Sequence, residues 1–393
     1  MSRCVTHDLA LHPTRDEWAA QDFVGSLRSH VLNTMAASMK TRFETTIAPR
    51  LPAPPADSSA VHKAMRGDDY FRFYSALRVN AQEMVWDSVR GSVERERAGL
   101  AARTAALAAD RTRAAGTLTL DPALEMPANV AGHDVHLMPG CYHGESGEGD
   151  VAAGAVYDNG LSVFSFGLMG ANLDDIGSSI TNWLQRKHPE FRPARILDLG
   201  CSVGHQTLPW AVAYPAAEVI GIDVAAPCLR YAHGRAQAQH VTAHFVQADA
   251  RTTGFADASF DLVFSSMFLH ELPARDIDAV FAEARRLLRP GGLLLHYELP
   301  PNRAVAPYDG FYLDWDSWYN AEPYYKPYRD QDPRDIAARA GFAPDRYFET
   351  VVPSLGWYGA DTVAAALAGT TDIGGNTGRL ADGVQWFVFG NWA

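Results

Sequence analysis

Glycines and aspartates near residue 200 have the types and spacing of a nucleoside-binding turn. The run ILDLGCSVGHQT (196–207) passes from a short apolar strand into the loop Gly200–Gly204, and Asp223 ends the next strand-like run, 23 residues after Gly200. Ligands of an open α/β sheet bind beyond the carboxyl ends of the strands, so we expect this loop and this acid to meet. A carboxylate there can accept hydrogen bonds from both ribose hydroxyls, and the segment therefore predicts a bound nucleoside.

The same loop indicates which nucleoside derivative binds. A dinucleotide site has the pattern G-x-G-x-x-G, which lets the backbone approach a pyrophosphate, whereas this loop reads G-x-x-x-G with Ser202 at the missing glycine. Asp198 would repel a diphosphate and attract the ammonium group of an amino acid. These residues fit S-adenosylmethionine, a nucleoside that carries an amino acid. A left-handed backbone at Ser202 would cost about 1 kcal/mol or more.

Four further motifs follow in order, and with them the second half of the chain resembles the class I, seven-stranded, S-adenosylmethionine-dependent methyltransferases. The motifs are VIGID (219–223), VQADA (246–250), FDLVFSSMFLHEL (260–272) and LLRPGGLLLHYE (287–298). The resemblance spans about Arg195–Ala393. It implies that S-adenosyl-L-methionine is the cofactor and that the protein is an enzyme that transfers its methyl group.

The resemblance also assigns roles along the cofactor cleft. Gly200 and Gly204 would let the loop approach the methionine part of the cofactor, and Asp198 would orient that part. Asp223 would hold the ribose diol, and Asp249 would accept a hydrogen bond from the adenine amino group. Further implied cofactor contacts are Cys201, Ser202, Val224, Ala250, Ser265, Met267, Phe268 and, from upstream, Tyr157.

His270 and Glu271, just after the fourth-strand motif, are the candidate catalytic residues. Methyl transfer from a sulfonium is an in-line displacement, which mainly requires an aligned acceptor and exclusion of water. A general base is needed only when the acceptor must lose a proton. His270 and Glu271 could supply it, and Glu298 is a further candidate in the same cleft. An equally good interpretation is that His270 merely packs beside the cofactor.

The segment 306–328 is the most unusual stretch of the chain, because it holds nine aromatic residues together with four acids. It follows the fifth strand, where the resembled family commonly inserts elements that cover the substrate. Aromatic rings with acids suit an organic cation or a planar acceptor. For most of these rings we favour burial in a lid against the N-terminal helices. The candidate substrate contacts are Tyr312, Trp315, Trp318, Tyr319 and, from an earlier segment, His143.

His133, His136, Cys141 and His143 invite a zinc interpretation of the segment 133–144. Their spacing, H-x2-H-x4-C-x-H, matches no standard metal-binding pattern. On a strand, His133 and His136 would also point to opposite faces. We therefore expect no metal here, and favour a polar wall of the substrate pocket or an ordinary loop.

The overall composition narrows the possible partners. The formal net charge of −12 argues against nucleic acid, whose binding depends on clustered basic residues. The four cysteines (Cys4, Cys141, Cys201 and Cys228) form no CxxC pair, which favours a reducing cytoplasm. No apolar run approaches the roughly 18 residues of a membrane span. We expect a cytoplasmic protein without a membrane partner, and the sequence leaves a homodimer open.

The pattern of elements gives the expected architecture. Helical patterns cover 15–48 and 69–115, and the Gly-rich stretch 117–170 holds short β-like pieces at 133–138, 153–158 and 161–167. A helix at 175–187 precedes strand-like runs that alternate with helices, which predicts a doubly wound, mostly parallel sheet. The strand-like runs are 195–199, 218–223, 243–249, 260–266 and 293–299, with 346–352 and 384–390 as a closing pair.

Three regions follow from this pattern. They are a helical N-terminal region (1–116), a β-containing connecting segment (117–190) and a methyltransferase domain (191–393) with an aromatic insertion at 300–331. The leading hypothesis is methyl transfer to a small molecule enclosed by the N-terminal helices and the aromatic lid. The alternatives are methylation of a peptide or protein, which needs an open groove, and a protein of the same fold that binds the cofactor without transferring methyl groups.

Overall fold

A mostly parallel β-sheet forms the centre of the C-terminal half of the chain. The computed structural model describes residues 7–110, 112–114, 116–374 and 384–393, so Cys4 lies outside the described residues. Within them the sheet has the strand order β1-β4-β3-β2-β5-β6-β8-β7, with β8 antiparallel to both of its neighbours. The strands are β1 Leu118–Thr119, β2 Arg195–Leu199, β3 Glu218–Asp223, β4 His244–Gln247, β5 Phe260–Ser266, β6 Leu288–Glu298, β7 Tyr347–Pro353 and β8 Gln385–Trp392.

Helices cover both faces of this sheet, which is why its central strands are mostly apolar. In β2, the residues from Ile196 to Leu199 are all buried. One face packs against α7 (Asp175–Lys187) and α8 (Leu208–Ala213), and the other against α10 (Ala274–Leu287) and α13 (Pro333–Arg339). The predicted doubly wound, mostly parallel α/β sheet is therefore confirmed, and the closing antiparallel pair is β7 and β8.

The strand count differs from the expected seven. The extra strand, β1, is two residues long and pairs in parallel with β4 through Leu118 and Thr119. It comes from the chain that connects the N-terminal helices to the sheet. A strand this short leaves no alternation pattern in the sequence.

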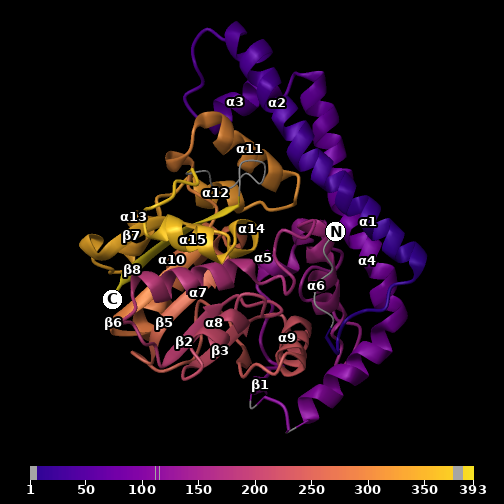
Figure 1. Cartoon of the computed structure of the whole chain (residues 1–393), viewed down its shortest axis with the longest axis vertical. Helices are drawn as coiled ribbons and strands as arrows, with labels where there is room; N and C mark the ends of the chain where they lie inside the picture. Colours follow the sequence, from indigo (N-terminus) through magenta and orange to yellow (C-terminus); the bar gives the residue numbers. More distant parts are fainter. Residues whose placement is uncertain (1–6, 111, 115, 375–383) are drawn as a thin grey trace.

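The N-terminal region is helical, as predicted, and lies against one side of the sheet domain. Its helices are α1 Arg15–Ser29, α2 Ala36–Arg42, α3 Ser58–Met65 and α4 Asp69–Ala109, with π-helical turns at His30–Met35 and Phe43–Ile47. Figure 1 shows α1 and α4 side by side along one flank of the molecule, and α4 contacts α6 and α9 of the adjoining layer. In the part of the chain that the structure describes, no helix has the length and apolar character to cross a membrane.

The prediction of β-like pieces within 133–167 is wrong. Val135–Leu137 form a single 3-10 turn, and Ala152–Phe164 form helix α6. The glycines that suggested strands serve helix packing. A Cβ added at Gly154 would lie 2.6 Å from Cβ of Tyr231, and one at Gly160 would lie 2.4 Å from the Trp86 ring. α6 therefore needs glycine in order to approach its neighbours α9 (Ala226–Ala238) and α4 closely.

The aromatic insertion forms α11 (Pro307–Trp318) and α12 (Tyr325–Arg329), which extend from the sheet toward the N-terminal helices (Figure 1). The ring of Trp315 stacks at a tilt on Tyr74 of α4, with ring centroids 4.7 Å apart, and its Nε1 donates to Ser75 Oγ at 2.8 Å. The expected packing of a lid against the N-terminal helices is therefore present. The remaining short helices are α5 Ala128–Ala131, α14 Leu355–Tyr358 and α15 Ala360–Leu367.

His296, near the end of β6, gives the core a pH-dependent stability. Its side chain is fully buried between Phe281 and Phe389, and burial lowers its pKa to about 3. Between about pH 6.5 and pH 4 the unfolded chain binds a proton at this residue and the folded chain does not. The free energy of unfolding therefore loses about 1.4 kcal/mol for each pH unit of acidification in that window, relative to a chain without this histidine.

Urea unfolding of the wild type and of His296→Leu at pH 7, 6 and 5 measures this effect. The variant loses the hydrogen bond between His296 Nδ1 and Ser265 Oγ (2.7 Å), which gives an offset that does not depend on pH. We expect the wild type's advantage over the variant to shrink steadily as the pH falls. A difference that stays constant from pH 7 to pH 5 would contradict the prediction.

Candidate active site

A cavity of about 370 Å³ opens at the carboxyl ends of β2, β3 and β5. One part is lined by the Gly200 loop and the ends of these strands, and the other by α4, α6 and the aromatic insertion. Twelve of the residues expected at the site line it: Tyr157, Asp198, Gly200, Cys201, Ser202, Asp223, Val224, Ala250, Met267, Phe268, His270 and Glu271. The cavity thus joins the predicted cofactor loop to the predicted lid.

Asp223 ends β3 beside the glycine loop, and its carboxylate is fixed by the backbone. Oδ2 accepts the N–H of Ser202 and Oδ1 accepts the N–H of Ala225, both at 2.9 Å. The N–H groups of Gly200 and Cys201 both donate to the carbonyl of Ile222, which ties the loop to β3. Burial raises the pKa of Asp223, and the backbone hydrogen bonds to its carboxylate oppose this shift. Each oxygen keeps a lone pair, so the group can still accept from a diol.

Ser202 has the left-handed backbone that the G-x-x-x-G loop suggested, with a φ of 48°. Its Oγ is buried and has no hydrogen-bond partner among the described residues, although the residue lines the cavity. A buried hydroxyl without a partner fits a bound polar ligand, since burial without a hydrogen bond is unfavourable. The loop therefore has a serine at a position whose left-handed backbone conformation favours glycine.

We expect Ser202→Gly to raise the free energy of unfolding by up to about 1 kcal/mol, because it removes both the left-handed strain and the unpaired hydroxyl. Chemical denaturation of the ligand-free protein measures the change. Ser178→Gly, an ordinary helical position in α7, is the control and should lower stability. A loss of stability in Ser202→Gly would mean that the loop is not strained at this residue.

Asp198, near the end of β2, is the buried acid of the loop. Thr207 Oγ1 donates to its Oδ2 at 2.6 Å. Burial raises the pKa of Asp198 to about 7; the Thr207 hydroxyl opposes the shift and the nearby Asp223 adds to it. A carboxyl group with this pKa changes its charge near neutrality, so a cationic ligand would draw it into the ionised form.

The adenine end of the cleft differs from the expectation. Ala250 and Val224 line the cavity, but Asp249 does not, and its carboxylate pairs with Arg251, whose Nη2 lies 2.5 Å from Oδ2. The backbone N–H of Arg251 also donates to Asp249 Oδ1 at 2.8 Å. Gly204 too lies outside the cavity lining, against Phe245. The geometry therefore favours a structural role for both residues.

Met267 and Phe268, which directly follow β5, line the cavity as expected. Ser266 also lines it, whereas the expected Ser265 does not. Ser265 points into the core, where its Oγ pairs with His296. Phe268 lies against the loop so closely that a Cβ on Gly200, whose φ is +74°, would sit 2.3 Å from its ring. Glycine at position 200 is thus required by contact as well as by conformation.

His270 and Glu298 form a fixed pair at the acceptor end of the cavity. Glu298 Oε1 accepts the N–H groups of Phe268 (2.8 Å) and Leu269 (2.7 Å), while Oε2 lies 2.5 Å from His270 Nδ1. Burial disfavours the charged imidazole, but Glu298, Glu271 and Glu322 together raise the pKa of His270 to about 9. Glu298 itself does not line the cavity. It positions His270, whose other nitrogen is left for the cavity.

Three polar residues complete this end: His136, from the segment for which the sequence suggested a polar wall of the pocket, and Asn320 and Glu322, which it did not name as contacts. His136 adopts a left-handed backbone (φ 58°), and its carbonyl accepts from Gln82 Nε2 and Trp86 Nε1 of α4. Burial works against its charged form, but Glu322 and Glu271 raise the pKa of His136 to about 10. The α4 helix therefore positions an active-site side chain.

Helical periodicity could have found the residues of the lid that face the cavity. In α11 and just beyond it, the cavity-lining residues are Leu313, Asp316, Ser317 and Asn320, spaced as one helix face. The expected contacts Tyr312, Trp315, Trp318 and Tyr319 lie outside the cavity lining, as does His143. Tyr312 and Trp315 are buried, whereas Trp318 is 69% exposed. The rings thus serve mainly to pack the lid.

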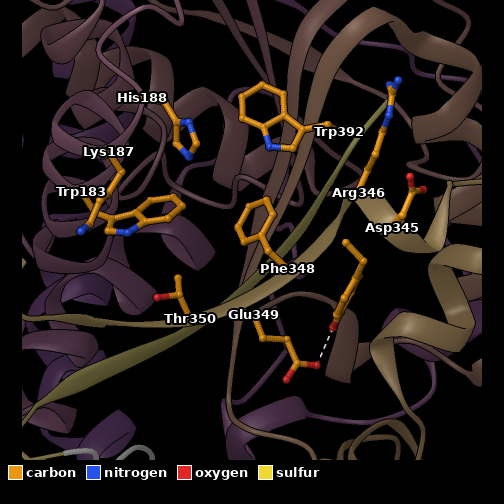
Figure 2. Close-up of a pocket in the computed structure, with 10 residues that line it drawn as sticks. Trp183, Lys187, His188, Asp345, Arg346, Phe348, Glu349, Thr350 and Trp392 are labelled. Carbon is orange, nitrogen blue, oxygen red and sulfur yellow. Dashed lines mark hydrogen bonds between the residues drawn. The ribbon is translucent and has the colours of Figure 1, made fainter.

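A second hollow, shown in Figure 2, lies elsewhere on the domain. Trp183, His188, Phe348 and Trp392 surround it, and Tyr347 donates a hydrogen bond to Glu349 at its edge. It lies where α7 ends and β7 begins, which is the amino-terminal edge of the parallel strands. The glycine loop is at the opposite edge, so this hollow is separate from the candidate active site.

The fold and the cavity define a nucleoside-binding domain of the doubly wound class. Residues 196–292 match the family model described as a methyltransferase domain. The match contains the glycine loop, Asp223 and the His270–Glu271 pair, which are the residues that the structure brings to the cavity.

Curated relatives align with the same part of the chain. The chain is 41% identical over 103 residues to malonyl-[acyl-carrier protein] O-methyltransferase of Xylella fastidiosa (26% of this chain, 34% of the relative). It is 37% identical over 112 residues to demethylmenaquinone methyltransferase of Thermus thermophilus (28% of this chain, 50% of the relative). The chain thus spans half or less of the length of these relatives.

A solved structure of similar fold is phosphoethanolamine N-methyltransferase 2 of Haemonchus contortus in complex with S-adenosyl-L-methionine. It is 19% identical, with a TM-score of 0.39, over 60% of this chain and 57% of that one.

Proposed function

We propose that this protein transfers a methyl group from S-adenosyl-L-methionine to a small-molecule acceptor held inside the cavity. The single observation that carries the proposal is the continuity of this cavity. It runs from the Gly200 loop and Asp223, where the nucleoside would bind, to Asn320 and Tyr325 of the lid. The N-terminal helices pack on the outside of that lid through Trp315, so the acceptor end is covered.

The residues of the cleft suit the cofactor. Asp223 would accept from the ribose hydroxyls, and the slot between Val224 and Ala250 would hold the adenine. Asp198 would face the charged amino-acid end, where the unpaired Oγ of Ser202 offers a further polar contact. When bound, S-adenosylmethionine supplies an electrophilic methyl group. The chain's own contribution is to align the acceptor with it and to exclude water.

The acceptor end holds the groups that could handle a proton. His270 is oriented by Glu298, and Glu271 and Glu322 lie 3.6 and 3.8 Å from its Nε2. His270 and Glu271 remain the candidate catalytic residues, and we assign Glu298 a positioning role because it does not line the cavity. The name of one curated relative, demethylmenaquinone methyltransferase, supports a small metabolic acceptor.

The shape of the cavity and the composition of the chain favour a small-molecule acceptor over the alternatives. A peptide or protein acceptor needs an open groove, whereas residues of α4, α6 and α11 line this cavity and cover part of it. The net charge of −12 also disfavours nucleic acid, and we place the protein in the cytoplasm on its cysteine pattern. A homodimer stays a prediction, which light scattering would test.

Two measurements test the proposal. Calorimetry with S-adenosylmethionine and with its demethylated product should show binding of both. Incubation with radiolabelled S-adenosylmethionine and a bacterial extract, split by ultrafiltration, should place the label in the small-metabolite fraction. Label in the protein fraction would favour the peptide alternative, and binding without transfer to either fraction would favour the non-methyltransferase alternative.

A further inference from the structure

The acceptor end of the cavity contains a cluster that the proposed methyl transfer does not by itself require. One ligand atom from each of His136, Glu271 and Glu322 lies within 4.8 Å of the others. They come from three distant segments: the turn after α5, the exit of β5, and the lid. We propose that these three side chains bind a divalent cation of the first transition row, with open coordination positions toward the cavity.

The three side chains lie close enough together to share one ion. His136 Nε2 lies 3.2 Å from Glu271 Oε1, and His136 Nδ1 lies 3.2 Å from Glu322 Oε1. Glu271 Oε1 is nevertheless buried without a hydrogen-bond partner among the described residues. Donor atoms bonded to one ion at about 2.1 Å are separated by about 3.0 Å when adjacent and by about 4.2 Å when opposite. His136 offers one ring nitrogen to the ion, and the three ligand atoms already lie within 4.8 Å of one another, so small side-chain movements would bring them to that spacing.

Two further buried side chains lie beside the cluster, Asn320 through its Nδ2, which is 2.8 Å from His136 Nδ1, and His270. Asn320 is 2% exposed, and its Oδ1 has no hydrogen-bond partner in the described part of the chain, while its Nδ2 donates to Glu322. His270 is 4% exposed; Glu298 holds its Nδ1, and its Nε2 lies 3.6 Å from Glu271 and 3.8 Å from Glu322, beyond hydrogen-bond length. Both groups are placed to bind water on the ion, as groups around metal ligands often do.

Charge and ligand type indicate the class of ion. Two carboxylates balance a charge of two, and one imidazole with two carboxylates suits Mn²⁺, Fe²⁺ or Zn²⁺ better than the all-oxygen set preferred by Mg²⁺. Because the open positions face the cavity, an acceptor would reach the ion through an oxygen atom. That last role rests on the proposed function, whereas binding of the ion does not.

The test uses the full chain stripped of metal and titrated with Mn²⁺, followed by the loss of the free-ion electron paramagnetic resonance signal. We expect one ion per chain, a gain in water-proton relaxation that reports open positions, and displacement by Zn²⁺ but not by an equal concentration of Mg²⁺. Glu322→Gln and His136→Ala should each weaken Mn²⁺ binding by about 100-fold or more, since even outer-shell changes cost about 10- to 100-fold. His188→Ala, in the hollow of Figure 2, is the matched control and should bind as the wild type does.

The outcomes separate this inference from the proposed function. Wild-type protein that binds S-adenosylmethionine in calorimetry but neither Mn²⁺ nor Zn²⁺ would overturn the metal site and leave the function standing. The cluster would then be an ion pair of protonated His136 with its two carboxylates. Mn²⁺ binding that is equally strong in His188→Ala, Glu322→Gln and His136→Ala would also overturn it. Circular dichroism melting of each variant shows that it is folded, and Glu271→Gln replaces any variant that is not.

Discussion

Asp223→Ala should weaken the binding of S-adenosylmethionine by about 100-fold or more. The carboxylate would accept two hydrogen bonds from the ribose, and a hydrogen bond to a charged group contributes about 1.5–3 kcal/mol. The substitution also leaves the N–H groups of Ser202 and Ala225 without their partner, which loosens the glycine loop. Isothermal titration calorimetry with the demethylated product, which is chemically more stable, measures the loss.

Asp249→Ala is the matched control for this experiment. The sequence motif gives Asp249 an adenine contact, but in the structure its carboxylate pairs with Arg251 outside the cavity lining. We expect the affinity of the Asp249→Ala variant for the demethylated product to stay within a few-fold of that of the wild type. An unchanged affinity in Asp223→Ala would refute the ribose assignment, and a large loss in Asp249→Ala would restore the adenine contact that the motif implies.

The affinity for S-adenosylmethionine should fall about tenfold for each pH unit below 7. In the free protein Asp198 has a pKa of about 7, raised chiefly by burial, so it is neutral in acid. The cationic amino-acid end of the ligand favours the ionised carboxylate. Binding must then expel a proton, and the cost of doing so is about 1.4 kcal/mol for each pH unit below the pKa.

Calorimetry between pH 5.5 and pH 8 checks this dependence, and two buffers of different ionisation enthalpy count the released proton. Asp198→Asn should bind more weakly than the wild type at pH 8 and lose most of the pH dependence. It keeps the shape of the side chain and a partner for Thr207 Oγ1. A wild-type affinity that is constant over this range would show that Asp198 does not sense the ligand's charge.

The sequence predicted the cofactor half of the cavity well, because its determinants are local. The loop from Gly200, the acid at Asp223 and the exit at Met267 each follow directly from a strand, and parallel strands end at one edge of a sheet. Asp249 and Ser265 show the limit of the motif. Whether each points into the cleft depends on a partner, Arg251 or His296, that the motif does not contain.

The acceptor half could not be predicted in the same way. Its polar residues lie on three segments, and His136 reaches the cavity through a left-handed backbone held by Gln82 and Trp86. The sequence predicts β-like pieces in the connecting segment, whereas Gly154 and Gly160 allow helix α6 to approach Tyr231 and Trp86 there. Whether such a segment forms a helix or a strand depends on contacts between distant parts of the chain, and no local sequence pattern contains this information.

The long helix α4 has a consequence for how such a protein can diversify. Through Gln82 and Trp86 it fixes the backbone of His136, whereas the backbone hydrogen bonds that tie the nucleoside loop to the sheet go to β3. The helical layer thus lines the acceptor end together with His270 and Glu271, which follow Met267 and Phe268 directly in the chain. Changes in α4 and α11 can alter which acceptor fits while the cofactor loop stays as it is, so new acceptor preferences can arise by remodelling the helical layer alone.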